Sequence, residues 1–265
     1  MKTSRLKNIV IVILLLVNAF LLVLLLSRRA EQRAAYDRSV EQLVTLFDAS
    51  GITLEPAVLP QDDALLSSAL DRDLERETAF AAALLGTVSV SDSGGGVCLY
   101  SGEYGLCSIR AGGAVEGSVS RPVEDPDLFC RDLFKSFGYE RTVTQLTDGS
   151  GSVTGVRTTG SSPVFNAALT LSFSGGRLIS VSGVFLSSLS KGRSGDGVDA
   201  VTALVRFLDY RTASGLVCTE ILSVESGYLL QSSAPAPLRL LPVWRIVTDV
   251  NNYYVNYKTG EITRE

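Results

Sequence analysis

Apolar and polar positions divide the chain into one long apolar run and a longer mixed region. Ile9–Leu26 contains eighteen residues, of which only Asn18 is polar. In a helix such a run spans about 27 Å, close to the ~30 Å hydrocarbon core of a bilayer. The pattern therefore predicts a single transmembrane helix, with residues 1–29 as the cytoplasmic N-terminus and membrane anchor.

A cleaved signal peptide is the alternative interpretation of this run. Signal peptides have an apolar region of about 7–15 residues and a small-x-small cleavage site. The run here is longer, and Arg28-Arg29 follow it directly. Basic residues flank both of its sides, so the orientation is inferred from the long C-terminal domain, which translocates largely regardless of charge. We expect a single-pass cell-membrane protein with its N-terminus inside and its C-terminal domain extracytoplasmic.

Beyond the run, stretches with helical spacing alternate with groups of short strands. Apolar residues at intervals of three and four predict helices over 31–49, 70–85, 122–139 and 198–210. Residues 164–174 alternate with period two, which is typical of a half-buried strand. The other strands are predicted over 88–91, 97–101, 104–110, 152–159, 177–186, 216–230, 238–250 and 253–256.

Because the strands are grouped after helices, the pattern indicates an α+β fold with antiparallel sheets. A helix followed by about three strands occurs twice in the C-terminal two thirds, and residues 70–118 resemble a degenerate third instance. We expect a stalk helix and first α+β subdomain over 30–120, a second helix-plus-sheet unit over 121–190 and a third over 191–265.

The composition argues against several kinds of catalytic, metal-binding and nucleic-acid-binding site. The chain has no histidine, which excludes His-dependent nucleophile systems and His-ligated zinc. Residues 30–265 carry 19 basic and 28 acidic side chains, a net charge of −9, which argues against a nucleic-acid partner. We expect no catalytic residues, no cofactor, no metal site and no small-molecule substrate. The acidic residues Asp71, Asp73, Glu75 and Glu77 are interpreted as the solvated face of a helix.

The four cysteines, Cys98, Cys107, Cys130 and Cys218, have no metal-ligand spacing. If Gly102-Glu103 form a two-residue turn, Cys98 and Cys107 face each other, and an extracytoplasmic disulfide between them is a candidate. The alternative is that both are small buried hydrophobic residues. Asn18 is a candidate contact with a neighbouring membrane helix, because its amide can hydrogen-bond across a helix pair. The alternative is a single tolerated Asn.

Several short motifs resemble a known family. Leu16-Val17-Asn18-Ala19-Phe20 in the apolar run, Gly51-Ile52, Leu84-Leu85-Gly86 and the closing segments Pro242–Ile246 and Tyr253–Ile262 are similar to the YycI/YycH group of regulatory proteins of Gram-positive bacteria. The last segments also resemble PepSY-like and cystatin-like modules, which end on a comparable hairpin.

The resemblance implies a membrane-anchored regulator that modulates a cell-envelope two-component sensor kinase through protein and transmembrane-helix contacts, with Asn18 in the contact. Its implied partners are the membrane, the sensor histidine kinase and a sister accessory protein. The alternative is a PepSY-like extracytoplasmic module that binds a peptide or inhibits a protease. A cell-envelope hydrolase that uses carboxylates is a third hypothesis.

Overall fold

The computed structural model describes residues 2–60, 66–187, 193–194, 197–232 and 238–265. Within these ranges the side chains of residues 2–13, 29–30, 32, 66–69 and 193–194 lie outside the description.

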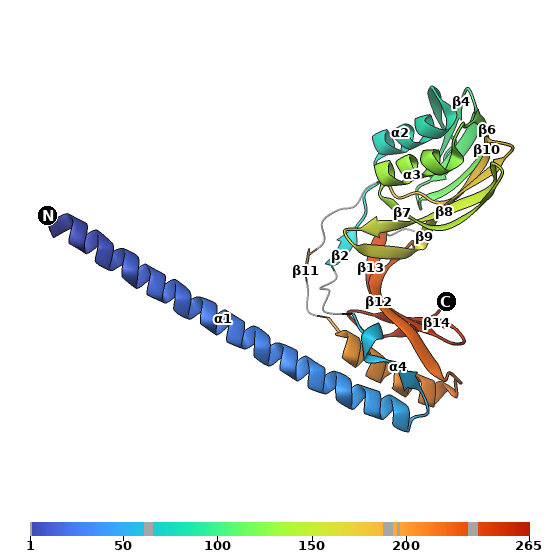
Figure 1. The fold of residues 1–265 in the computed structure, drawn as a ribbon. Coiled ribbons are helices and arrows are strands. Elements are labelled where there is room, and N and C mark those ends of the chain that lie inside the picture. Colours follow the sequence, from blue (N-terminus) through green and yellow to red (C-terminus); the bar gives the residue numbers. More distant parts are fainter. Residues whose placement is uncertain (1, 61–65, 188–192, 195–196, 233–237) are drawn as a thin grey trace.

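A single helix, α1 (Lys2–Ala49), forms the N-terminal fifth of the chain and projects far from the rest of the molecule (Figure 1). Its sequence contains no glycine or proline before Gly51, so nothing interrupts its hydrogen bonds. Gly51 ends it with a φ of 72°, in the left-handed region that glycine tolerates. One helix therefore contains both the apolar run and the predicted helix over 31–49.

Among the residues described, none of the helices has an apolar segment of the extent that a bilayer requires. Ile9–Ile13, the first part of the predicted anchor, belong to the residues whose side chains lie outside the description. From Leu14 to Leu26 the large apolar side chains of α1 are exposed, with exposed fractions of 41–66%.

The remaining chain forms an α+β structure in which one pattern, a helix followed by four antiparallel strands, occurs three times. The first repeat consists of α2 (Leu74–Leu85), β3 (Val88–Asp92), β4 (Val97–Gly102), β5 (Gly105–Arg110) and β6 (Ala114–Pro122). The second consists of α3 (Pro126–Phe137), β7 (Tyr139–Thr147), β8 (Ser150–Thr159), β9 (Ser162–Ser174) and β10 (Arg177–Val184). The third consists of α4 (Ala200–Ser214), β12 (Glu220–Gln231), β13 (Arg239–Thr248), β14 (Asn252–Asn256) and β15 (Ile262–Arg264).

The first two repeats share one eight-stranded antiparallel sheet. Its order is β7-β8-β9-β10-β6-β5-β4-β3, because the last strands of the two repeats, β6 and β10, pair with each other. Helices α2 and α3 lie side by side on one face (Figure 1). The other face carries many serine and threonine side chains, including a hydrogen-bonded pair, Thr154 and Thr170. This is the usual arrangement of an antiparallel sheet with one face toward water.

The third repeat packs against the end of α1. Val40, Leu43 and Phe47 of α1 are buried with Phe207 of α4 and the α4-facing side of β12–β14. The indole nitrogen of Trp244 donates to the Val198 carbonyl oxygen over 2.7 Å. The shorter elements β1 (Thr53–Leu54), the 3₁₀ helix η1 (Pro56–Val58), β2 (Leu66–Ala69) and β11 (Arg193–Ser194) border this part.

Two hydrophobic cores result, and they divide the chain differently from the three predicted units. The upper core joins the first and second repeats, so the predicted boundary between residues 120 and 121 lies inside it. The lower core joins the stalk end of α1 to the third repeat. Strand β9 connects the cores, because Val164 and Ala167 belong to the lower one and Leu169 and Leu171 to the upper one.

The differences from the predicted elements have local causes. Each repeat has four strands instead of three, because β6, β7 and β15 were not predicted. Residues Glu140–Gln145 of β7 are all exposed, so the strand has no alternating apolar pattern. Helix α2 starts at Leu74 instead of residue 70 because Asp73 accepts a hydrogen bond from the Arg76 N–H and caps the helix.

Candidate functional site

The eight-stranded sheet has an open edge at β3, which pairs only with β4 among the described strands. Along β3, Val88 and Val90 alternate with Ser89 and Ser91, and Asp92 ends the strand. The pairing with β4 has no register shift, so the strand is regular from end to end. A regular edge strand presents unpaired backbone groups that can accept another strand.

The hydrogen-bond pattern shows which backbone groups are free. The Ser93 N–H donates to the Val97 carbonyl oxygen over 2.9 Å. Antiparallel pairs alternate between bonded and non-bonded. Ser89 and Ser91 therefore bond to β4, while the N–H and C=O groups of Val88, Val90 and Asp92 point away from β4 toward the open side.

The side of α2 that lies toward β3 adds an apolar wall to this edge. Val90 is opposite Tyr100 on the helix-covered face of the sheet, and its side chain is 50% exposed. Leu74, in the first turn of α2, is 53% exposed. Thr78 follows one turn later and turns its hydroxyl back to the Leu74 carbonyl oxygen. A strand added beside β3 would place every second side chain along this wall. We call Val88–Asp92 with Leu74 and Thr78 the β3 edge.

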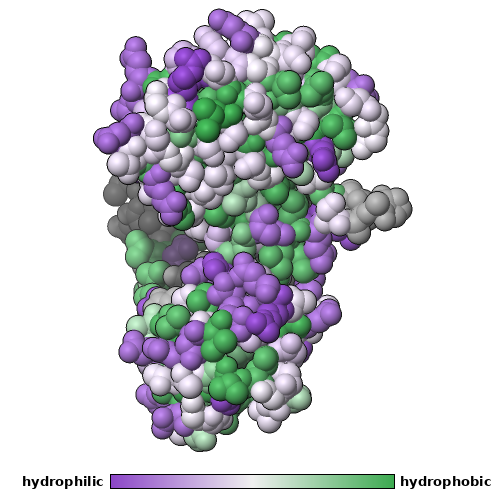
Figure 2. Space-filling view, turned by 90° about the vertical axis from the view of Figure 1, so that its right-hand side faces the viewer, coloured by the Kyte–Doolittle hydropathy of each residue, from purple (hydrophilic) through white to green (hydrophobic). Residues whose placement is uncertain are grey.

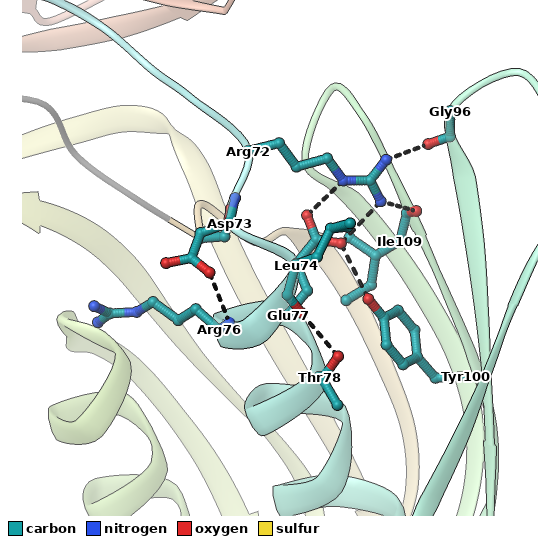
Figure 3. Close-up of polar contacts among 10 residues, drawn as sticks. Arg72, Asp73, Leu74, Arg76, Glu77, Thr78, Gly96, Tyr100 and Ile109 are labelled. Carbon is teal, nitrogen blue, oxygen red and sulfur yellow. Dashed lines mark hydrogen bonds and ion pairs between the residues drawn. The ribbon is translucent and has the colours of Figure 1, made fainter.

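A buried polar cluster fixes α2 in this position (Figure 3). Glu77 is 2% exposed, and Arg72 contacts its two carboxylate oxygens in a bidentate pair, with both distances 2.8 Å. Arg72 also donates to the carbonyl oxygens of Gly96 and Ile109, over 2.7 and 3.1 Å. The Tyr100 hydroxyl donates to Glu77 over 3.2 Å. The cluster thus connects the first turn of α2 to β4 and β5.

The electrostatics of the cluster agree with a structural role. The hydrogen bond to Glu77 raises the pKa of Arg72 above its usual value. Burial, with the negative charge of Glu77, raises the pKa of Tyr100 to about 12. Tyr100 therefore stays protonated near neutral pH and acts as a hydrogen-bond donor. Glu77 corrects the expectation that all four acidic residues of this segment are solvated.

The segment from Glu77 to Ile109 carries only acidic charge, and two arginines contact it from outside: Arg72 at Gly96 and Arg121 over the Tyr104 ring. Between Arg76 and Arg110 the sequence contains no lysine or arginine. Asp92 ends β3 and is exposed. Glu103 is also exposed and lies at the other end of the strand, because it follows Gly102, the partner of Val88. One of its Oε atoms lies 3.6 Å from where a Cβ on Gly86 would be. Glu75, on α2, is also exposed. The edge is therefore neutral along its length and acidic at its ends.

The opposite face of the sheet offers a less defined surface. Figure 2 shows the molecule from the side away from α2 and α3, where polar and apolar residues alternate over the upper part and hydrophobic ones gather in the middle. Phe165 of β9 packs against Tyr254 of β14, with ring centroids 5.6 Å apart, and under Arg245 of β13 at 5.2 Å. These side chains therefore already contact one another within the protein.

The candidate disulfide does not form. The turn is Glu103-Tyr104 instead of Gly102-Glu103, because Gly102 pairs with Gly105. This shift places Cys98 opposite Ile109 and Cys107 opposite Tyr100. All four cysteines are free and buried. Burial raises the pKa of the Cys107 and Cys130 thiols to about 12, as expected for core residues.

Asn18 lies on the exposed part of α1, and its side-chain amide donates to the Leu14 carbonyl oxygen of the same helix over 2.8 Å. A partner-helix role for Asn18 stays a prediction. In the part of the chain that the structure describes, no group of three or more cysteine, aspartate or glutamate side chains is arranged to hold a metal ion. No sequence pattern predicts the β3 edge, because the edge arises only from the strand order.

Comparison with known proteins gives distant similarities. No family model and no curated protein matches the chain. Among solved structures, it is similar to the C-terminal domain of Bacillus megaterium YpeB, with 12% identity, a TM-score of 0.34, and coverage of 74% of this chain and 98% of that one. It is also similar to an uncharacterized protein from Eubacterium rectale, with 10% identity, a TM-score of 0.41, and coverage of 75% and 80%.

Both similarities are too distant to assign a family or a function. Neither protein is named as a YycI or YycH protein.

Proposed function

We propose that this protein is a membrane-tethered, non-catalytic module that binds an extended polypeptide by strand addition at the β3 edge. The observation that carries the proposal is the open edge itself, whose outward N–H and C=O groups at Val88, Val90 and Asp92 match the spacing of an added antiparallel strand. The apolar wall of Leu74 and Thr78 would contact alternate side chains of the bound segment.

This function corresponds to the PepSY-like peptide-binding alternative from the sequence. The third repeat, a helix followed by a meander that ends at the Tyr253–Ile262 segment, agrees with the pattern of that resemblance.

The tether is α1. Its apolar surface between Leu14 and Leu26 is exposed on all sides of the helix, and a continuous apolar surface of this kind needs lipid or other helices to cover it. Because Val40, Leu43 and Phe47 fix the other end of the same helix in the lower core, insertion of α1 would hold the binding body near the membrane, on the extracytoplasmic side.

The test is selection of random seven-residue peptides on the full-length chain in detergent micelles. We expect selected peptides to lose at least tenfold in affinity for Val90→Pro, which removes an outward N–H but no hydrogen bond to β4. Val90→Thr keeps that N–H and is expected to bind within about twofold of the parent. Equal binding to all three proteins would refute strand addition at β3.

A second candidate function is modulation of a sensor kinase through α1, as the YycI/YycH resemblance implies. The observation that favours it is Asn18 on the exposed apolar surface, where its amide could exchange the bond to Leu14 for one to a partner helix. Asn18→Leu should then weaken co-purification with a kinase while the body stays folded. Unchanged association would exclude this role for Asn18.

A further inference from the structure

We propose that the segment bound at the β3 edge is a basic peptide of another protein, with lysine or arginine at both ends of a short uncharged stretch, and not a second copy of this chain. This inference rests on the proposed function and specifies its partner.

The charges at the edge select such a ligand. Asp92 lies at one end of β3, and Glu103 lies beside Gly86 at the other. Arg72, which precedes α2, is paired with Glu77, and Arg121, which lies over the Tyr104 ring, donates to the Ala83 carbonyl oxygen. A peptide antiparallel to β3 and centred on Val90 would bring its two ends to these carboxylates. Opposite charges at such exposed pairs attract modestly, and the attraction falls as salt screens it.

The same charges oppose self-pairing. If two copies paired through β3 around Val90, Asp92 of each copy would face Val88 of the other, close to Glu103 of that copy. Two acidic pairs would then be formed, and like charges across a strand pair are destabilising. A second copy is therefore disfavoured as the occupant of this edge.

The two faces of β3 determine which residue types suit the middle of the peptide. The residue opposite Val90 would share its face and lie along Leu74 and Thr78, which favours a β-branched or other apolar side chain. Its two neighbours would lie on the other face with Ser89 and Ser91, which favours polar residues such as threonine.

The test uses a labelled five-residue peptide, lysine-threonine-valine-threonine-lysine, whose terminal residues would lie opposite Asp92 and Val88, and a matched peptide with terminal glutamates. Binding to the full-length chain in uncharged detergent is measured by fluorescence anisotropy in 20 mM and 500 mM salt. We expect the lysine peptide to bind about tenfold tighter in low salt, with the difference shrinking to about twofold in high salt.

The combined variant Asp92→Asn and Glu103→Gln should lose this preference, since the Asn amide oxygen can still accept the hydrogen bond that Asp92 receives from the Gly94 N–H. The matched control, Glu116→Gln with Glu140→Gln, removes two exposed carboxylates elsewhere on the same sheet and should keep it.

The outcomes distinguish the charge preference from the strand-addition site itself. If both peptides bind equally but Val90→Pro abolishes binding, the strand-addition site stands and the charge selection is wrong. If Val90→Pro changes neither, the proposed function itself fails. A dimer in sedimentation that Val90→Pro dissociates would show that the occupant is a second copy, which would overturn the inference.

Discussion

At the scale of single residues, the buried Arg72–Glu77–Tyr100 cluster shows how a charged side chain can serve the fold. The sequence pattern predicts that Glu77 lies on a solvated helix face. Only the tertiary structure shows that Arg72 and Tyr100 donate hydrogen bonds to it. Burying a carboxylate is tolerated when it is paired and hydrogen-bonded. Here that pairing sets the position of α2 beside the β3 edge.

The cluster predicts a large effect for one substitution. Glu77→Gln leaves the Arg72 guanidinium without its anion, and we expect a loss of about 3 kcal/mol in the free energy of unfolding. Glu75→Gln, two residues away and exposed, should change it by less than about 0.5 kcal/mol. Urea unfolding followed by circular dichroism measures both, and equal effects would contradict the assigned role of Glu77.

The buried thiols predict a dependence on alkaline pH. The folded-state pKa of Cys107 and Cys130, about 12, lies above the ordinary thiol value of 9.0 because both groups are buried. The stability that these protonated thiols contribute is fully present below pH 9 and is lost as the pH rises toward 12. The urea midpoint should therefore fall between pH 9 and pH 11. The fall should be smaller in the Cys107→Ala, Cys130→Ala variant, and an identical fall would exclude the thiols as its cause.

At the scale of elements, α1 has two different ends. Its first part is exposed and apolar, while its last three turns pack in the lower core. The arginine Arg211 of α4 donates to the Ser50 carbonyl oxygen just after α1 ends, over 3.2 Å. This contact, with Phe47, fixes the direction in which the helix leaves the body.

Removing the core contact of α1 should destabilise the lower core specifically. Phe47 is fully buried, and Phe47→Ala is expected to lower its stability by about 3–5 kcal/mol. Leu46, its neighbour, is 44% exposed, so Leu46→Ala should cost less than about 1 kcal/mol. The fluorescence of Trp244, the only tryptophan of the chain, reports this core during denaturation. Similar midpoints for both variants would mean that α1 is not anchored there.

Element prediction from the sequence succeeded where local signals are strong. Apolar spacing predicts the four helices, and the structure shows that Gly86 and Gly138 end two of them. Strands with one buried face, such as β9, were found from alternation. No sequence pattern predicts the exposed strand β7, because it buries little, and the turn predicted at Gly102-Glu103 lies one residue later, at Glu103-Tyr104. That shift alone changed the cysteine pairing, since strand register depends on the turn.

At the scale of the whole molecule, the order of the strands creates the β3 edge, which no local sequence pattern predicts. Pairing of β6 with β10 joins two repeats into one sheet and leaves β3 at its edge. The candidate site could not be predicted from the sequence, because Val88–Asp92 would read the same in the centre of a sheet. In the proposed function, the body binds the peptide and α1 tethers the body to the membrane.

The tether predicts how the full-length chain fractionates in cells. The apolar surface of α1 should keep it in the membrane fraction after alkaline carbonate extraction. Leu16→Arg with Leu22→Arg should release it, since each arginine at mid-helix opposes insertion by about 3 kcal/mol. Leu222→Arg, at an exposed apolar position in the third repeat, should not. Release of the parent chain by carbonate would contradict the anchor.

Hydrogen–deuterium exchange of single amides in β3 tests strand addition most directly. Without peptide, the amides of Ser89 and Ser91, which bond to β4, should exchange slowly, and the outward amide of Val90 should exchange rapidly. Saturating lysine-ended peptide should slow exchange at Val90 at least tenfold and leave the edge strand β7 unchanged. Rapid exchange at Val90 with the peptide bound would show that the peptide binds elsewhere.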